Sequence, residues 1–430
     1  MRILLICPYF PPENAIAAVR MGSFARHLAE AGDSIRVLAR EPETSGLSEP
    51  DAELEIAVQR VPDPAIATKM HLRRLALMTD PRRLVDIPGN SQGNQGLVPA
   101  VRDKVERGVR SIVNFPDPFT YWAFRAIRKA DLQDWMPDVI VASAGPMSSF
   151  VVAQRLSRLY KVPWVADYRD LLSTGFYFPF GRFRRSIDRR VEYSLVKGAS
   201  AITAVSQPMA DHLARFHGAR VHLVMNGYEP TEFGVPPASE SSPAAVSQLS
   251  LVYCGEVYAG RRDPSQLFKA MRTLQGHGSD VTVDFYGATV NWLQELVVRE
   301  GLVGRVHLHK RVNHAESLSL QCSADVLLLL TWNDPREAYT MTGKVFEYIG
   351  ARRPILMLGY KNSAAARLVR DRRLGVIANE PDDIAAALSA WAREKQSRGA
   401  ISQVSEGAGV GLTRRDQALA MRAILTRITP

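Results

Sequence analysis

The chain has 430 residues, which is long for a single hydrophobic core, so two domains are expected. Hydrophobic residues make up 46% and charged residues 23%, as in ordinary soluble globular proteins. No run approaches the roughly 18 apolar residues that a membrane-spanning helix needs, which leaves a soluble or peripheral protein. The three cysteines, Cys7, Cys254 and Cys322, favour reduced core residues in a cytoplasmic protein over a disulfide framework.

The formal net charge is +10, and much of the excess lies in two segments. Residues 60–129 contain thirteen Lys and Arg against six Asp and Glu, and residues 179–197 contain six against two. Such segments suit an anionic membrane surface, a nucleic acid or an acidic substrate, or form a solvated face. Arginines and large apolar residues mix at 62–132, which is typical of a membrane interface and equally of a helical insertion. Because no nucleic-acid-binding motif accompanies them, no nucleic-acid partner is expected.

Strand and helix patterns alternate along residues 1–234, which predicts a parallel sheet with covering helices. Strands are expected at Arg2–Pro8, Ile35–Ala39, Glu55–Val61, Asp138–Ser143, Val162–Ala166, Ala199–Val205 and Val221–Met225. Helices are expected at Ala15–Ala31, Pro146–Tyr160 and from Ser206. Residues 235–248 are rich in proline, serine and alanine, as in an interdomain linker.

The alternation resumes in residues 249–411, which predicts a second Rossmann-like domain in an α/β protein. Strands are expected at Leu249–Cys254, Val281–Tyr286, Val306–His309, Asp325–Thr331 and Pro354–Gly359. Helices are expected after Pro264, at Val290–Glu300 and Ser317–Ala324, from Thr342, and at Ala364–Arg370 and Asp382–Lys395. A last helix, Thr413–Thr426, is expected within residues 412–430.

The clearest site in the sequence is the strand–loop–helix–strand unit at 325–359. Open parallel sheets bind ligands at the carboxyl ends of their strands, and a helix amino terminus offers free N–H groups to a phosphate. The amides around Thr342, Gly343 and Lys344 could therefore hold a diphosphate. Glu347, one turn into the helix, could accept hydrogen bonds from ribose hydroxyls. The alternative, which the spacing alone favours, is an ordinary first-turn glutamate that the helix dipole stabilises.

A second phosphate-binding candidate follows the first strand of the second domain. Gly255 gives a tight turn, and Arg261 and Arg262 could hold a diphosphate through charge-assisted hydrogen bonds. The alternative is an exposed arginine pair on a loop. Three histidines, His307, His309 and His314, have no cysteine or carboxylate at a suitable spacing, so no metal site is expected.

The stretch from Gly343 to Leu356, with the pattern G-K-x-x-E-Y followed by A-x-x-P-I-L, resembles the donor-binding stretch of retaining glycosyltransferases of family 4. Those enzymes have two Rossmann-like domains that face each other across a cleft, the GT-B architecture. In the family, the second glutamate of an E-x7-E motif contacts the donor ribose, and Glu347 matches it; the first would fall at Tyr339. Family members usually carry G-R…K where this chain has Gly255-Glu256, and Arg261 or Arg262 matches the second basic position.

The resemblance also assigns roles outside these motifs. It places the region of Val312 near the nucleotide base. On the acceptor side, small residues from Asn14 onwards would let a sugar approach the first helix, where Arg20 could meet an acceptor or a phosphate. Arg169 and Asp170 follow a strand and resemble a loop that faces the reaction centre, which suggests acceptor binding or general-base work; an Asp–Arg pair that only holds the loop is equally expected.

The resemblance implies a retaining glycosyltransferase that moves a sugar from a nucleotide-diphosphate donor to a polysaccharide, lipid-linked or other glycan acceptor. No metal and no cofactor besides the donor are expected, because Arg261 and Arg262 would stabilise the departing diphosphate. A cytoplasmic location, at the inner face of the plasma membrane, would suit such an acceptor. The last helix often crosses back to the first domain in this architecture. A nucleotide-sugar 2-epimerase and a non-catalytic subunit remain alternatives, the latter because Glu256 and Tyr339 replace expected donor ligands.

Overall fold

The structure is a computed structural model, and it describes residues 1–13, 15–42, 56–63, 115–130, 132–176, 181–234, 248–275 and 280–429. Two compact units emerge: Met1–Met225 with Gln417–Pro430, and Asn226–Asp416. Most of the expected insertion at 62–132 and of the expected linker at 235–248 lies outside the described residues. No helix in the described part of the chain combines the length and the apolar composition needed to cross a membrane.

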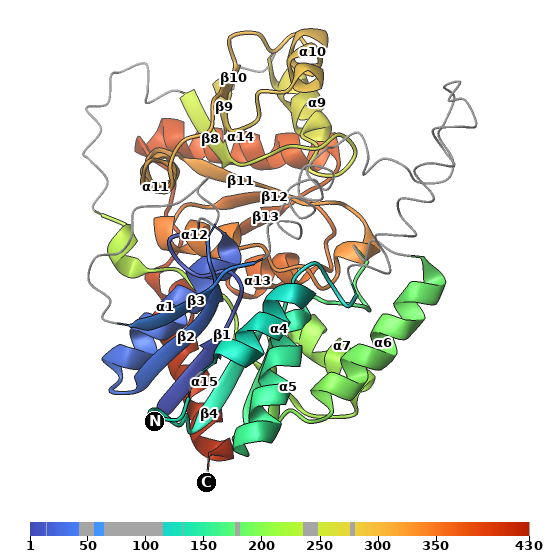
Figure 1. Ribbon diagram of the computed structural model, residues 1–430. Helices are drawn as coiled ribbons and strands as arrows, with labels where there is room; N and C mark the ends of the chain where they lie inside the picture. The colour runs from blue at the N-terminus through green and yellow to red at the C-terminus, as the bar shows by residue number, and fades with distance from the viewer. Residues whose placement is uncertain are drawn as a thin grey trace. The chain divides into compact units, whose positions relative to one another are not determined.

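A parallel sheet forms the centre of the first unit (Figure 1). In the described residues its order is β3-β2-β1-β4-β5-β6-β7. The strands are β1 (Arg2–Ile6), β2 (Ser34–Arg40), β3 (Ala57–Val61), β4 (Val139–Ser143), β5 (Trp164–Tyr168), β6 (Ala201–Ala204) and β7 (Val221–Leu223). The sequence order reverses between β1 and β4, and doubly wound sheets bind ligands at the carboxyl side of such a point.

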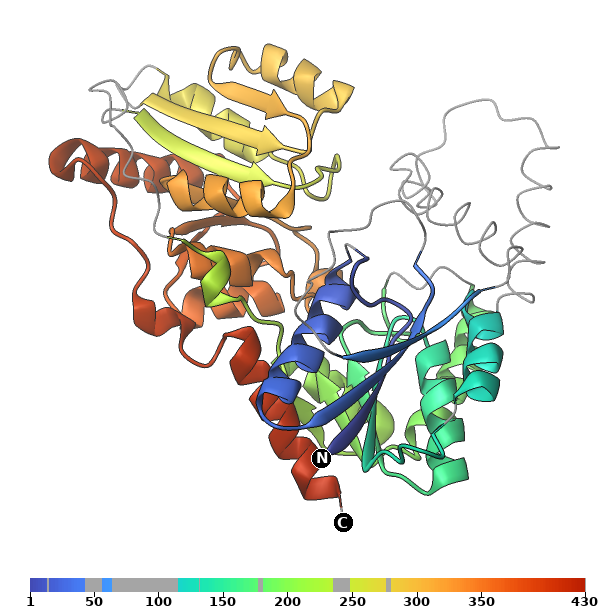
Figure 2. The same cartoon turned by 60° about the vertical axis from the view of Figure 1, so that its left-hand side comes forward.

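Helices cover both faces of this sheet, because right-handed crossovers that run in opposite directions from β1 and β4 place them on opposite sides. The helices are α1 (Ile16–Glu30), α4 (Thr120–Lys129), α5 (Ser148–Tyr160), α6 (Arg182–Val196), α7 (Gln207–His217) and α15 (Arg414–Ile428). Figure 2 shows α15 beside α1, and Met421 and Leu425 of α15 share a buried cluster with Phe24 and Leu28 of α1. The expected return of the last helix to the first domain is confirmed.

The second unit contains another parallel sheet, in the order β10-β9-β8-β11-β12-β13 within the described residues. Its strands are β8 (Gln248–Cys254), β9 (Asp280–Tyr286), β10 (Val306–His309), β11 (Val326–Leu330), β12 (Ile355–Leu358) and β13 (Gly375–Ile377). Its helices are α9 (Ser265–Leu274), α10 (Asn291–Arg299), α11 (His314–Ser323), α12 (Lys344–Ala351), α13 (Ala364–Asp371) and α14 (Pro381–Arg398), and the 3-10 turns are η1 (Pro230–Glu232), η2 (Pro335–Glu337) and η3 (Glu406–Gly409). The order reverses between β8 and β11, so two Rossmann-like units are confirmed.

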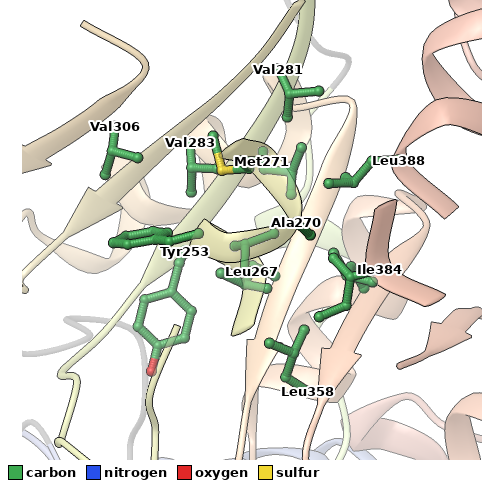
Figure 3. Close-up of a cluster of buried hydrophobic side chains, with 14 of the residues drawn as sticks. Tyr253, Leu267, Ala270, Met271, Val281, Val283, Val306, Leu358, Ile384 and Leu388 are labelled. Atoms are coloured by element: carbon green, nitrogen blue, oxygen red, sulfur yellow. The ribbon is translucent and has the colours of Figure 1, made fainter. Parts of the chain in front are cut away.

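A hydrophobic cluster supports the site end of β8. Leu249, Leu251 and Tyr253 alternate along one face of the strand, as the two-residue period of a strand requires, and pack among residues of α9 and α14. Figure 3 shows the Tyr253 hydroxyl pointing away from the aliphatic side chains. This hydroxyl donates to the Glu256 carbonyl at 2.9 Å. The core therefore extends directly beneath the loop that follows β8.

Candidate functional site

Gly255 and Lys344 meet where β8 ends and α12 begins. Gly255 has a φ of +151°, which favours glycine, and a Cβ there would lie 2.7 Å from Lys344 Nζ. The ammonium group of Lys344 therefore rests against the backbone of the β8 turn. The pKa of Lys344 is lowered overall, because burial and the charge of Arg262 outweigh the opposite effect of Glu347. Only the amide of Lys344 was assigned from the sequence, and the structure adds its side chain.

Arg262 closes the turn that follows β8. The Tyr258 amide donates to the Arg262 carbonyl at 3.1 Å, and the Arg262 guanidinium lies 5.6 Å from the centroid of the Tyr258 ring. Its charge acts on Lys344 and also on Tyr253, whose buried hydroxyl has a pKa raised by desolvation and lowered by Arg262. The positive charge of Arg262 therefore acts on the first residue of α12.

Helix α12 presents its positive end at the same place. Gly343 is its N-cap, Thr342 precedes it, and the first-turn amides of a helix have no partner within the helix. The Tyr348 hydroxyl donates to the Leu328 carbonyl at 2.9 Å and ties the helix to β11. The helix tip is therefore fixed at the carboxyl end of the sheet, where an anion can approach it.

The Glu347 side chain of α12 contacts α11. Gln321 Nε2 of α11 donates to Glu347 Oε2 at 3.0 Å, which fixes the carboxylate. The pKa of His314 is raised first by its hydrogen bond with Glu232 and further by the Glu347 charge. Burial raises the pKa of the Cys254 thiol, and Glu347 adds to that shift. The negative charge of Glu347 therefore acts at the end of β8 as well as near the start of α12.

Arg261 has different neighbours from Arg262. Its guanidinium lies 4.7 Å from the centroid of the Trp332 ring, and that of Arg336 lies 4.0 Å from the same ring. Arg336 donates to both carboxylate oxygens of Asp334, at 2.6 and 2.8 Å. Trp332 and Arg336 were not predicted from the sequence as site residues, although they follow β11, where an α/β sheet binds ligands.

Glu256 does not extend the cationic pair. Tyr258 donates its hydroxyl to the exposed Glu256 carboxylate. Burial and this hydrogen bond raise the pKa of Tyr258 to about 12. Where the resemblance implied a basic side chain, this chain therefore has a tyrosine–carboxylate contact.

The loop that contains Val312 adjoins an aromatic stack. Gly287, at a φ of +88°, donates its amide to the His309 carbonyl at 3.1 Å, and a Cβ there would lie 3.9 Å from Arg311. The rings of Tyr286 and His309 stack with centroids 4.4 Å apart, and His309 Nε2 lies 2.7 Å from Asp284 Oδ1. This stack was not predicted from the sequence. Within the described residues, no group of three or more His, Cys, Asp or Glu could hold a metal ion.

Arg20 corrects an expectation for the acceptor side. Its side chain is buried, with 6% of the residue exposed, and Nε and Nη2 donate to the Asp167 carboxylate at 3.1 and 2.8 Å. It also donates to the carbonyls of Val224 and Met225, at 2.9 and 2.7 Å. The guanidinium therefore joins α1 to β5 and to the chain after β7. Because it is buried and engaged in these contacts, the expected contact of Arg20 with an acceptor is wrong.

Arg169 and Asp170 directly follow β5, and the Arg169 side chain reaches the residues that follow β4. Arg169 donates to the carbonyls of Ala144 and Gly145 at 2.9 and 2.7 Å, and it lies near Tyr9 and Ser143. The side chain of Asp170 is 71% exposed, and Oδ2 lies 3.7 Å from Arg169 Nη1. The buried hydroxyl of Ser143 has no hydrogen-bond partner among the described residues. The other predicted residue on this side, Asn14, lies outside them.

Most of the first unit matches a known protein family. Residues 17–229, which include Arg169 and Asp170, match the glycosyl transferase 4-like domain. The chain is therefore a glycosyltransferase with a domain of this family in its first unit. None of the curated proteins matches its sequence.

Solved structures share the whole fold of this glycosyltransferase at low sequence identity. HepE from Anabaena, in complex with UDP and glucose, is 14% identical, with a TM-score of 0.61 over 99% of this chain and 100% of HepE. Sucrose-phosphate synthase from Thermosynechococcus elongatus is 15% identical, with a TM-score of 0.63 over 100% of this chain and 99% of the synthase. The lipopolysaccharide outer core galactosyltransferase WaaB, in its apo form, is 12% identical, with a TM-score of 0.57 over 99% of this chain and 100% of WaaB. All three likenesses show the GT-B fold.

Replacing Gly255 with alanine should weaken donor binding by the glycosyltransferase. The new Cβ would displace the Lys344 ammonium, which lies 2.7 Å from its position. Loss of one charge-assisted hydrogen bond costs about 1.5–3 kcal/mol, or about a tenfold to a hundredfold loss of affinity. Titration calorimetry with the donor measures this change.

Gly304→Ala is the matched control. Gly304 also has a positive φ, +82°, but nothing lies within 4 Å of its Cβ position, so only the cost of the backbone conformation remains. Equal losses of donor affinity in the two variants would show that strain, and not the position of Lys344, explains the effect.

Proposed function

We propose that this glycosyltransferase moves a sugar, with retention of configuration, from a nucleotide-diphosphate donor to a polysaccharide, lipid-linked or other glycan acceptor. The observation that carries the proposal is that Lys344, the first residue of α12, places its ammonium against Gly255, and that the Arg262 charge acts on this ammonium. Groups of this kind bind phosphate oxygens. The likeness to HepE, which holds UDP-glucose in one of its structures, supports a nucleotide sugar as the donor.

The donor lies along the carboxyl edge of the second sheet in this proposal. Glu347 accepts hydrogen bonds from the ribose hydroxyls, and the backbone near Val312 borders the base. Arg262, Lys344 and the amides around Gly343 hold the diphosphate. Arg261, against the Trp332 ring, adds a further positive charge.

Catalysis rests on stabilising the leaving diphosphate. As the bond between the sugar C1 and the phosphate oxygen breaks, negative charge grows on the diphosphate, and fixed cations and amides lower the energy of that state. The acceptor hydroxyl forms the new bond to C1 on the face that the diphosphate leaves, and its proton passes to the departing phosphate oxygen. No covalent enzyme intermediate is needed. Because Arg262 and Lys344 supply the positive charge, we propose that the reaction uses no metal ion or cofactor.

The acceptor is bound by the first unit in this proposal. Asp170 is exposed at the carboxyl end of β5, and Arg169 lies beside it. An exposed carboxylate can orient a sugar hydroxyl by accepting its hydrogen bond. We propose that the enzyme works in the cytoplasm, with a glycan or lipid-linked acceptor at the inner face of the plasma membrane.

The test is incubation of the whole protein with a panel of nucleotide sugars, followed by measurement of nucleotide release and of the sugar product. Release with transfer, or slow hydrolysis that retains the anomeric configuration, supports the proposal. Release of an epimerised free sugar would instead identify a 2-epimerase. Neither binding nor release with any donor would identify a non-catalytic subunit and contradict the proposal.

Replacing Glu347 with alanine should lower donor affinity by about tenfold to a hundredfold, because a charged acceptor of ribose hydrogen bonds is lost. Asp383→Ala is the control, since Asp383 is also a first-turn carboxylate and is exposed on α14. It should change stability slightly through the helix dipole and leave donor affinity unchanged. Equal donor affinity in Glu347→Ala and the unaltered protein would remove Glu347 from the site.

A further inference from the structure

Helix α6 exposes positive charge and buries its negative charge. Both of its acidic residues, Asp188 and Glu192, are fully buried. Asp188 accepts a hydrogen bond from Arg184 at 2.7 Å, and Glu192 accepts one from Tyr168 at 2.9 Å. The outward-facing charges of this helix are therefore arginines, which opposes a merely solvated face where both signs would mix.

A groove of about 530 Å³ runs along this basic face, between α6 and α7. Figure 1 shows the two helices side by side in the first unit. The groove, here named the arginine groove, is lined by Arg182, Arg185, Arg189 and Arg190 and by the aromatic residues Tyr193 and Phe216. Four like charges around one opening repel one another, so the arrangement suits a surface that presents several closely spaced anions.

Aromatic contacts hold the arginine groove in shape. The Arg189 guanidinium lies 5.5 Å from the centroid of the Phe216 ring. Tyr193 packs edge-on against Phe216, with centroids 6.4 Å apart, and stacks on His217. Planar guanidinium groups that are already positioned lose less freedom when they bind phosphate oxygens.

An exposed phenylalanine on the same helix distinguishes among possible anions. Phe183 follows Arg182 and is 83% exposed, and Tyr193 is 42% exposed. At a bilayer surface such rings enter the boundary between headgroups and acyl chains while arginines bind the phosphates. A soluble polyanion would use the arginines and leave Phe183 in water. The combination favours an anionic lipid surface.

We infer that the arginine groove binds the phosphate groups of anionic lipids and seats the first unit on a membrane surface. This inference concerns a site separate from the donor site, and it does not depend on the transfer reaction. Donor and acceptor binding do not explain the basic segment at 179–197, and lipid binding gives it a role.

Sedimentation of the full chain with vesicles tests the inference. The protein should bind vesicles that mix phosphatidylcholine with phosphatidylglycerol and should not bind phosphatidylcholine alone. The triple variant Arg182→Glu, Arg189→Glu, Arg190→Glu should lower partitioning by about a hundredfold, since each basic residue near the surface contributes about a factor of five. Phe183→Ser should lower partitioning severalfold and leave binding of soluble polyphosphate unchanged.

The control reverses three exposed charges elsewhere: Lys269→Glu on α9, Arg367→Glu on α13 and Arg427→Glu on α15. It has the same net charge as the groove variant and should partition much as the unaltered protein does. Donor binding, which we assign to the second unit, should persist in every variant, and it serves as a test that the chain is folded. If the groove variant does not fold, the same three arginines are replaced by glutamine instead. Equal losses in the two triple variants, or binding of polyphosphate but not of vesicles, would overturn the inference.

Discussion

Replacing Lys344 with methionine should lower kcat for sugar transfer by about a hundredfold to a thousandfold, the usual cost of removing one group that stabilises charge in a transition state. Methionine preserves the length and the apolar stem of the side chain, so the packing against Gly255 stays similar while the ammonium is lost. Arg262→Gln should have an effect of the same order. Because these groups face charge that grows as the diphosphate leaves, kcat should fall more than donor affinity does.

The double variant Arg262→Gln, Lys344→Met shows whether the two cations act as one unit. Their charges influence each other directly, so the combined loss should be smaller than the product of the single losses. Arg299→Gln is the control, because Arg299 is a 71% exposed arginine of the same unit that pairs with Glu300. Initial rates at saturating donor measure the effect. A Lys344→Met enzyme with unaltered kcat would contradict the role given to this lysine.

Replacing Arg20 with methionine should destabilise the first unit by about 3–5 kcal/mol, because the buried Asp167 carboxylate would lose its charge partner. The carbonyls of Val224 and Met225 would lose donors as well. Hydrogen exchange of peptides from β5 and β6 measures the loss, with peptides from β8 and β9 as an internal reference.

Two further variants separate the ion pair from general packing. Arg2→Met removes a partly exposed pair with Asp138 and should change stability by less than about 1 kcal/mol. Arg20→Met combined with Asp167→Leu should recover much of the lost stability, since a buried ion pair can often be replaced by apolar groups. If Arg20→Met leaves exchange in β5 and β6 unchanged, the buried pair is not structurally important.

Much of the fold could be predicted because buried parallel strands are continuous apolar runs. The run before Trp332 identified β11, and the pattern after Gly343 identified α12 and the strand that follows it. From these two elements, the position of a phosphate site at the carboxyl edge follows by topology alone. Helix α6 was recognised only as a basic segment, because arginines interrupt its apolar face.

The side-chain partners were less predictable, since they depend on distant parts of the chain. Arg20 was assigned to the acceptor from its place one turn into α1, but its partner Asp167 lies 147 residues further along. The Lys344 ammonium was overlooked for the same reason, because it rests on Gly255 in another βα unit. Trp332 and Tyr286 went unselected because a single aromatic residue at a strand end is more often part of the core.

The most direct test of diphosphate binding at this site compares two affinities of the protein. One is for a nucleoside diphosphate, and the other is for the same nucleoside without phosphates. Titration calorimetry on the unaltered protein and on the Arg262→Gln, Lys344→Met variant provides all four constants. The unaltered protein should prefer the diphosphate by about a hundredfold or more, from two charge-assisted contacts, and the double variant should lose most of that preference. An equal preference in both proteins would show that the diphosphate is bound elsewhere.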